Sequence, residues 1–229
     1  MNGDLEIVEV LRNRGANINV ESLCCNAPLH NSVKSKKMEI TELLLKKGAH
    51  VNARNSHNFT PLQIAVVKGS KEIVKLLLKH GAYVNSACNF TSWDCCMPLW
   101  LGVIETSTSW GGYTPLLLAF GKGHEEVVKL LLEYWANVNA QDKDGKTVLH
   151  FDVEVGKDKV SQQLLESGAT VNAEYNYGKT VLHFAVEKEQ DKLVQILLEC
   201  GANVDAEHMY GKTVLHIAVE KGCSLINLL

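Results

Sequence analysis

A hexapeptide, Gly-Lys-Thr-Val-Leu-His, occurs three times in the second half of the chain, and successive copies are 33 residues apart. The copies begin at Gly145, Gly178 and Gly211. A fixed period of this length indicates one supersecondary unit repeated along the chain. Because each unit of such a chain packs only on its neighbours, the period predicts a row of stacked repeats rather than one large core.

A second marker, a Gly-Ala pair, extends the period over the first half of the chain. Its copies are separated by steps of 33, 33, 54, 33 and 33 residues and, with Trp135-Ala136 as a variant, begin at Gly15, Gly48, Gly81, Trp135, Gly168 and Gly201. An apolar run with helical spacing precedes each pair, as in Ile73, Leu76 and Leu77. Glycine most readily takes the left-handed conformation that ends many helices. Each repeat is therefore predicted to contain a turn, a short helix, a tight loop, a longer helix and a glycine stop.

The short helix is predicted to begin after a threonine, as at Thr60-Pro61. Threonine is a suitable N-cap, and proline is tolerated in the first turn because its missing N–H has no partner there. Neither helix buries its apolar stripe alone, so the stability of each repeat depends on stacking. We expect Leu149, Leu182 and Leu215, which share one place in the short helix, to be buried.

Several independent motifs share this register and resemble the pattern D-x-x-G-x-T-P-L-H-x-A…E-I-V-x-L-L-L-x-x-G-A-x-V-N-A of the ankyrin repeat family. The best copies are residues 52–85, 112–140, 139–172, 172–205 and 205–222, and a weaker copy covers 19–52. The resemblance implies an all-α fold, an ankyrin-repeat α-solenoid whose helix-loop-helix repeats carry β-turn fingers. We therefore predict a single array over residues 1–229, of about six to seven units with half-repeats at both ends.

The longer step of 54 residues predicts an irregular region at about 87–112. Residues 97–103 are similar to the start of a short helix, which favours a degenerate repeat without its second helix. A long loop on the finger side is an equally good interpretation. With either interpretation, a notch in the row of helices is expected near Trp93, Trp100 and Trp110.

Two single residues depart from the pattern. Trp135 replaces the helix-stop glycine, so it must either adopt the left-handed conformation or end the helix differently. Asp152 stands where Ala185 and Ala218 pack in the sister repeats, so its carboxylate must find a hydrogen bond, reach water or be protonated. A locally loosened repeat is the favoured interpretation of Asp152, and a functional carboxylate is the alternative.

Composition and charge narrow the classes of function. The net charge is −3, from 23 basic and 26 acidic residues, so no global field attracts nucleic acid. No apolar stretch is long enough for a membrane helix, so we expect no membrane insertion. Seven cysteines, an odd number with two adjacent pairs, do not indicate a disulfide framework. We expect an intracellular protein, cytoplasmic with a nuclear location as the alternative.

Catalytic and metal-binding patterns are weak. Residues 121–124 (Gly-Lys-Gly-His) lack the spacing of a phosphate-binding loop, and Gly145-Lys146-Thr147 lacks the required upstream glycine. Stacked repeats lie about 10 Å apart, too far for histidines of different repeats to share one zinc ion. The ankyrin resemblance implies instead that these histidines hydrogen-bond the neighbouring finger: His30, His150, His183 and His216. We predict no enzyme activity, no cofactor and no metal.

The resemblance and the residue pattern together predict a protein-protein interaction module or scaffold. We expect a monomer that binds a partner protein on its concave finger and short-helix face. Exposed aromatics beside long cations are typical of recognition surfaces. The candidate partner-binding residues are Arg54, His57, Phe59, Trp110, Tyr113, Lys146, Tyr175, Tyr177, Lys179, His208, Tyr210 and Lys212. The alternative is a regulatory or targeting domain of a larger protein, such as a ubiquitin-ligase substrate receptor or a channel.

Overall fold

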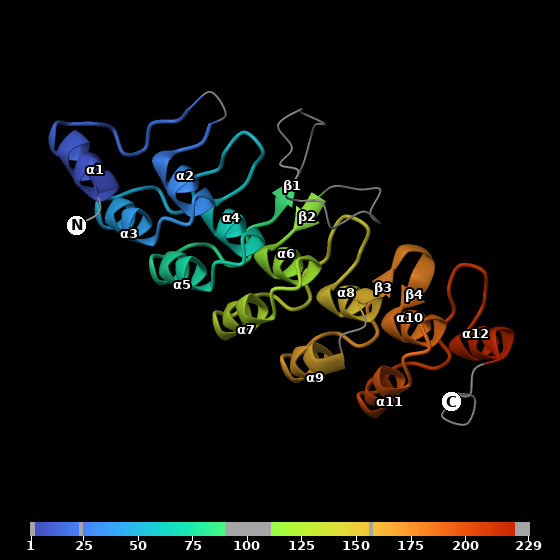
Figure 1. The fold of residues 1–229 in the computed structure, drawn as a ribbon. Coiled ribbons are helices and arrows are strands. Elements are labelled where there is room, and N and C mark those ends of the chain that lie inside the picture. Colours follow the sequence, from blue (N-terminus) through green and yellow to red (C-terminus); the bar gives the residue numbers. More distant parts are fainter. Residues whose placement is uncertain (1–2, 23–24, 90–110, 156–157, 223–229) are drawn as a thin grey trace. The chain divides into compact units, whose positions relative to one another are not determined.

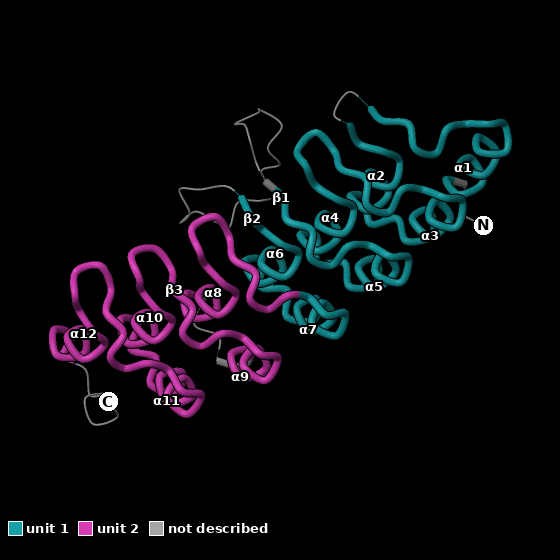
Figure 2. Tube along the Cα trace, turned by 180° about the vertical axis from the view of Figure 1, so that it is seen from behind, with its two compact units in different colours: residues 1–136 teal, residues 137–229 magenta. Residues whose placement is uncertain are grey.

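The computed structural model describes residues 3–22, 25–89, 111–155 and 158–222. Within these ranges the chain forms two compact units, residues 1–136 and 137–229, which Figure 2 colours separately. The period alone did not reveal this division. Most of the predicted irregular region, including Trp93, Trp100 and Trp110, lies outside the described residues.

In each unit, short and long helices form two rows, with finger loops projecting beyond the short helices (Figure 1). Unit 1 contains α1 (Gly3–Asn13), α2 (Pro28–Lys34), α3 (Met38–Lys46), α4 (Pro61–Val67), α5 (Lys71–Lys79), β1 (Cys88–Asn89), β2 (Gly111–Tyr113), α6 (Pro115–Gly121) and α7 (Glu125–Glu133). Unit 2 contains α8 (Val148–Val155), α9 (Asp158–Glu166), β3 (Glu174–Tyr175), η2 (Asn176–Gly178), β4 (Lys179–Thr180), α10 (Val181–Glu187), α11 (Asp191–Glu199) and α12 (Val214–Lys221). The strands pair antiparallel, β1 with β2 and β3 with β4.

The short helices begin as the sequence predicts. At α4, the Thr60 hydroxyl accepts from the Gln63 backbone N–H at 3.3 Å, and the Gln63 carboxamide oxygen accepts from Thr60 N–H at 2.9 Å. At α10, His183 takes the place of the glutamine, and its Nδ1 accepts from Thr180 N–H at 3.2 Å. This reciprocal arrangement satisfies backbone donors that a helix start leaves without partners.

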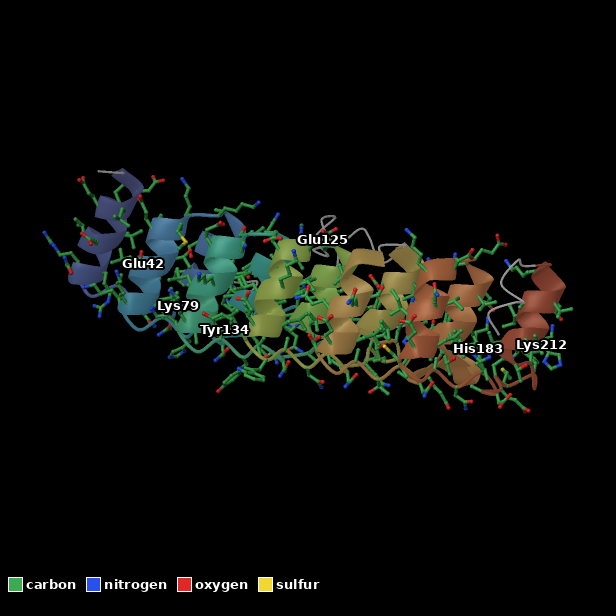
Figure 3. The ribbon with its side chains drawn as sticks, turned by 90° about the horizontal axis from the view of Figure 1, so that it is seen from below. Glu42, Lys79, Glu125, Tyr134, His183 and Lys212 are labelled. Atoms are coloured by element: carbon green, nitrogen blue, oxygen red, sulfur yellow. The ribbon has the colours of Figure 1, made fainter. Side chains whose placement is uncertain are left out.

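The repeat histidines also join one repeat to the next. The Nε2 atom of His30 lies 3.1 Å from the Ala53 carbonyl oxygen and 3.2 Å from that of Phe59, on the following finger. His183 contacts the Lys212 carbonyl in the same way at 3.3 Å, and Figure 3 labels both residues side by side. His216 is exposed and keeps only its contacts with Thr213. His30 and His183 therefore contact the following finger, whereas His216 makes no such contact within the described residues.

An asparagine after a long helix bonds the end of the next long helix in several repeats. The Asn52 side chain donates to the Gly81 carbonyl at 3.1 Å and accepts from Tyr83 N–H at 2.8 Å. Asn172 makes the same pair of bonds with Gly201 and Asn203. The polar ends of the long helices are thus satisfied by the preceding repeat.

Trp135 adopts the left-handed conformation of the glycines it replaces, with φ 63°. Its N–H bonds the Leu132 carbonyl at 3.0 Å, as the N–H of Gly81 bonds that of Leu78 at 3.0 Å. The helix therefore ends in the same way in both repeats, and the bulky residue accepts the backbone strain.

Asp152 is buried and receives a short hydrogen bond from the Ser161 hydroxyl of α9. The equivalent pair in the first full repeat is also polar, with Thr41 donating to Ser32 at 3.0 Å. In other repeats these two places hold alanine and valine, as at Ala65 and Val74. Asp152 thus belongs to a polar pair between the two helices of its own repeat, which identifies the hydrogen bond that its burial requires.

Candidate protein-binding groove

Each finger of unit 2 carries a lysine that bonds a glutamate eight residues later, in the last turn of the following short helix. The pairs are Lys146–Glu154, Lys179–Glu187 and Lys212–Glu220, each with an Nζ to Oε1 distance of 2.5 Å. The lysine precedes the helix start by two residues and the glutamate lies near its end. Each ion pair therefore ties the base of a finger to its own short helix.

These lysines become more accessible along the stack. The exposed fraction of the side chain is 4% for Lys146, 31% for Lys179 and 42% for Lys212. Lys146 is covered because its ammonium lies 4.6 Å from the centre of the Phe151 ring and 5.3 Å from that of Tyr175, on the next finger. The assignment of Lys146 to the partner-binding surface is therefore wrong, since its side chain is part of the interior.

Tyr175 is half-buried for the same reason. Its ring packs 5.8 Å from that of His150 and 5.6 Å from that of Phe184, between centroids. Burial lowers the pKa of His150 to about 4, and the nearby positive charge of Lys146 acts in the same direction. Tyr175 therefore packs between the short helices α8 and α10 through His150 and Phe184, rather than forming an exposed contact surface.

The two finger-tip tyrosines of unit 2 are exposed, Tyr177 by 70% and Tyr210 by 76%. His208, predicted to lie on the same surface, is mostly buried. Its Nδ1 accepts from Tyr210 N–H at 3.1 Å, and its ring lies 5.7 Å from that of His183. His208 therefore shapes the finger that presents Tyr210, because its side chain fixes the turn.

A groove of about 660 Å³ lies between the fingers and the short helices α10 and α12. It brings together four predicted residues, Lys179, His208, Tyr210 and Lys212, with five that the sequence analysis did not select. The additional lining residues are Glu187, Lys188, Ile217, Glu220 and Lys221. Four lysines against two glutamates leave the groove with a cationic excess. The glutamates were detectable in the sequence, because each follows a repeat lysine by eight residues.

In unit 1 the predicted contact residues are mostly used within the stack. Phe59 and Tyr113 are fully buried, so their assignment to the partner surface is wrong. Both occupy the repeat position of Lys146, immediately before the helix-capping threonine, where the side chain is buried at the base of the finger. Trp110 lies outside the described residues.

Arg54 is exposed but bonded. Its guanidinium donates to the Asn58 carbonyl at 3.0 Å and to the Ala87 carbonyl at 3.2 Å, so it joins two fingers. His57, beside it, is half-buried. Among the described residues, no cluster of three or more metal-ligating side chains occurs. Cys88 is buried, which raises the pKa of its thiol to about 12 and makes the reactive thiolate rare.

Within the described ranges, no helix is both long and apolar enough to cross a membrane. Paired helices, projecting fingers and a groove on the finger side define the class of helical repeat proteins whose exposed surfaces bind other molecules. A family model described as ankyrin repeats, in three copies, matches residues 1–88, 95–175 and 170–229. The chain belongs to the ankyrin repeat family, and proteins of this family generally mediate protein-protein interactions.

Two solved structures extend this comparison. The ankyrin repeat domain of Bcl-3, described as a member of the IkappaB protein family, is 25% identical with a TM-score of 0.74, over 93% of this chain and 86% of that one. The human ASB11 ankyrin repeat domain is 26% identical with a TM-score of 0.71, over 98% of this chain and 91% of that one.

A curated relative is similar over a shorter stretch. Rabankyrin-5 from Homo sapiens is 59% identical over 39 residues, which is 17% of this chain and 3% of that protein. The Mus musculus protein gives the same figures. The chain thus matches only a small part of these relatives' length.

Proposed function

We propose that this chain is an interaction module that binds a partner protein in the groove between the fingers and the short helices α10 and α12. The single observation that carries the proposal is the groove itself, which is lined by four lysines, two glutamates and the exposed Tyr210. Aromatic side chains provide large contact area with little loss of rotamer freedom, and they are enriched in the energetic centres of interfaces.

The charge pattern indicates an acidic partner segment. Lys179 and Lys212 are already paired with glutamates, so a partner carboxylate joins an existing pair rather than meeting an isolated cation. Lys188 is exposed and lies in the same groove. Such partly exposed charges contribute more to the rate and specificity of association than to the lifetime of the complex. The expected ligand is therefore an extended segment that alternates acidic and apolar side chains.

The framework favours this use because it is preformed. The lysine-glutamate pairs and the His208 turn hold the finger bases in place, so little ordering is required on binding. The cysteines at positions 25, 88 and 200 are free thiols, which supports our proposal that the protein functions in the cytoplasm or nucleus.

The test compares two double variants with a matched control. Partners retained by the wild-type protein are identified by mass spectrometry, purified and measured by surface plasmon resonance. Tyr177→Ala with Tyr210→Ala should accelerate dissociation, whereas Lys179→Glu with Lys212→Glu should slow association and remove its dependence on salt. Tyr83→Ala, at an exposed tyrosine of unit 1, is the control and should bind normally. Unchanged kinetics in both double variants would exclude the groove as the binding site.

A further inference from the structure

Trp135 is an exposed residue in a strained backbone conformation, directly after α7. Its exposed fraction is 88%, and its φ angle of 63° is the left-handed one that glycine adopts in the sister repeats. At Gly48, Gly81 and Gly168 an added Cβ would meet no atom within 4 Å, so this place offers a side chain no packing partner. Backbone strain that packing does not offset is characteristic of positions with a function.

A second exposed aromatic residue, Tyr83, follows the neighbouring long helix α5 and is 67% exposed. Lys71 and Glu126, at the starts of α5 and α7, form an ion pair of 2.9 Å, so the two packed helices run side by side in the same direction. Figure 3 labels Lys79 and Tyr134, at the ends of α5 and α7, on the same side of unit 1. The two exposed aromatic residues therefore follow adjacent helix ends.

Two lysines without a salt-bridge partner lie at the same helix ends. Lys79 is the last residue of α5, and Lys47 directly follows α3, which packs on α5. Both lysines are exposed and form no ion pair within the described residues, whereas Lys46 is paired with Glu42 at 2.7 Å. The helix-end patch consists of Lys47, Lys79, Tyr83 and Trp135. None of these residues lines the groove beside α10 and α12, so the two surfaces are independent.

The fold does not require the cations of the helix-end patch. A lysine at the end of a helix offsets the partial negative charge of the last carbonyl groups, which is its ordinary structural role. The long helices of unit 2 nevertheless end on glutamate and are followed by the same glycine turn. From α3 to α11, the last residues of the long helices are Lys46, Lys79, Glu133, Glu166 and Glu199. The cationic ends therefore distinguish α3 and α5 from the later repeats.

We propose that the helix-end patch binds an acidic segment of a partner protein. Carboxylates of the segment lie beside Lys47 and Lys79, and an apolar side chain packs on the Trp135 indole. Charge complementarity determines the sign of the segment, and tryptophan and tyrosine are enriched at the energetic centres of interfaces. Neighbouring long helices lie about 10 Å apart, the length of about three residues of an extended chain, so the acidic residues are expected at about that spacing.

A protein segment fits the patch better than a nucleic acid or a membrane surface. Anionic lipid is typically recognised by clusters of about four to eight lysines or arginines, and nucleic acid by a broad basic surface. The patch has only two lysines, and Glu133 stands two residues before Trp135. That carboxylate repels a continuous row of phosphates, whereas a peptide has few acidic groups and places them at the lysines.

Selection of displayed peptides identifies the class of ligand. Short random peptides are selected on the wild-type protein and counter-selected on the double variant Lys79→Glu with Trp135→Gly. Both changes introduce the residue that the repeat of α11 has at the same place, Glu199 and Gly201, so the variant should keep the wild-type circular dichroism spectrum. The retained peptides should be rich in aspartate and glutamate and should contain a large apolar residue.

Fluorescence anisotropy of a labelled retained peptide then measures each contribution. Trp135→Gly should weaken binding about tenfold or more, because a central tryptophan supplies a large share of interface energy. Lys79→Glu should slow association and reduce its dependence on salt. Lys192→Glu, which makes the same charge change at an exposed lysine of α11, is the matched control and should bind like wild type.

Two further variants separate this surface from the groove. Tyr83→Ala alters only the helix-end patch and should weaken the peptide, whereas Lys179→Glu with Lys212→Glu alters only the groove and should leave the affinity unchanged. The proposal is overturned if no peptide distinguishes wild type from the counter-selected variant, if the retained peptides are basic, or if the groove variant loses them. It is also overturned if vesicles of phosphatidylcholine and phosphatidylserine, or a single-stranded oligonucleotide, require the patch while no acidic peptide does.

Discussion

The two units have different residue types at the same position, the base of the finger. In unit 1 the residue before the helix-capping threonine is aromatic, Phe59 or Tyr113, and it is fully buried. In unit 2 it is a lysine paired with a glutamate of the short helix, as in Lys179 with Glu187. A buried aromatic side chain stabilises the finger through burial of apolar surface, and a ligand cannot reach it. A partly exposed ion pair leaves charged atoms that a ligand can reach.

This difference indicates where a repeat protein acquires specificity. The repeat pattern requires only that a side chain fill the base of the finger. In unit 1 a buried aromatic ring fills this position, so no charged group is exposed there. In unit 2 the Lys179 ammonium lies 5.4 Å from the centre of the Phe184 ring, and the side chain is still 31% exposed. Two of the lysines at this position, Lys179 and Lys212, line the groove beside α10 and α12.

The largest expected effect is in unit 1. Phe59→Ala should lower the free energy of unfolding by about 3–5 kcal/mol, because it removes a fully buried ring and leaves a cavity. Lys212→Ala, at the same repeat position in unit 2, should cost below about 1 kcal/mol. Urea denaturation monitored by circular dichroism measures both. Equal losses would show that the two units do not differ in how this position contributes to stability.

The ion pairs of unit 2 should differ among themselves according to burial. Glu154→Ala leaves the buried Lys146 ammonium without its carboxylate and should cost about 2–4 kcal/mol. Glu220→Ala releases the more exposed Lys212 and should cost below about 1 kcal/mol. When the same denaturation experiment is repeated in high salt, the stability loss for Glu220→Ala should become smaller still, whereas the loss for Glu154→Ala should not change. A large loss from Glu220→Ala would contradict the exposure gradient.

The histidines predict a pH dependence that is strongest in unit 2. Burial lowers the pKa of His150 from 6.5 to about 4, with Lys146 adding to the shift and the backbone of Lys179 and Ala173 opposing it. The unfolded chain therefore binds a proton more readily than the folded one between these values. The contribution of the neutral His150 to the free energy of unfolding is fully present above pH 6.5 and is lost as the pH falls toward 4. Between about pH 7 and 5, His150 alone should remove about 2 kcal/mol.

Unit 1 provides the matched variant for this test. Gln63 stands at the position of His150, completes the same helix cap and donates to the Ser86 carbonyl of the next finger at 2.8 Å. His150→Gln should therefore preserve stability near neutral pH and remove most of the loss at lower pH. His30 and His183, whose pKa values are also lowered by burial, should account for the remainder. An unchanged pH profile in His150→Gln would contradict the assignment.

The fold could be predicted from the sequence because stacking imposes the same residue at the same place in each repeat. The glycine stops, the threonine caps and the histidine contacts of His30 and His183 are all local consequences of that repetition. The short helix positions were also predictable, except where a neighbour is missing. Leu215 shares its place with Leu182 but not its burial, since burial depends on the next repeat and not on the residue itself.

The candidate site was harder to predict, for a physical reason. Finger-tip residues are free of the stacking constraint, whereas residues at the finger base point inward, and sequence spacing does not distinguish them. Phe59, Tyr113 and Lys146 were therefore assigned to the surface when all three are buried. The lysine-glutamate spacing was visible within each repeat, whereas the paired changes at Asp152 and Ser161 require comparison of two helices at once.

The smallest expected effect is a gain in stability at the end of α7. Trp135 is 88% exposed and holds the left-handed conformation that its sister repeats assign to glycine. At the corresponding Gly48, Gly81 and Gly168, an added Cβ would meet no atom within 4 Å, so a side chain at this place gains no packing. Trp135→Gly should therefore stabilise the protein by about 1 kcal/mol, since only the backbone strain is removed. Gly81→Ala, which introduces that strain in the neighbouring repeat, should cost a similar amount. Differential scanning calorimetry of both variants measures the pair, and a loss of stability in Trp135→Gly would mean that the indole ring makes a stabilising contact after all. A gain would leave the exposed tryptophan without a stabilising role, as expected for a residue retained for contact with another molecule.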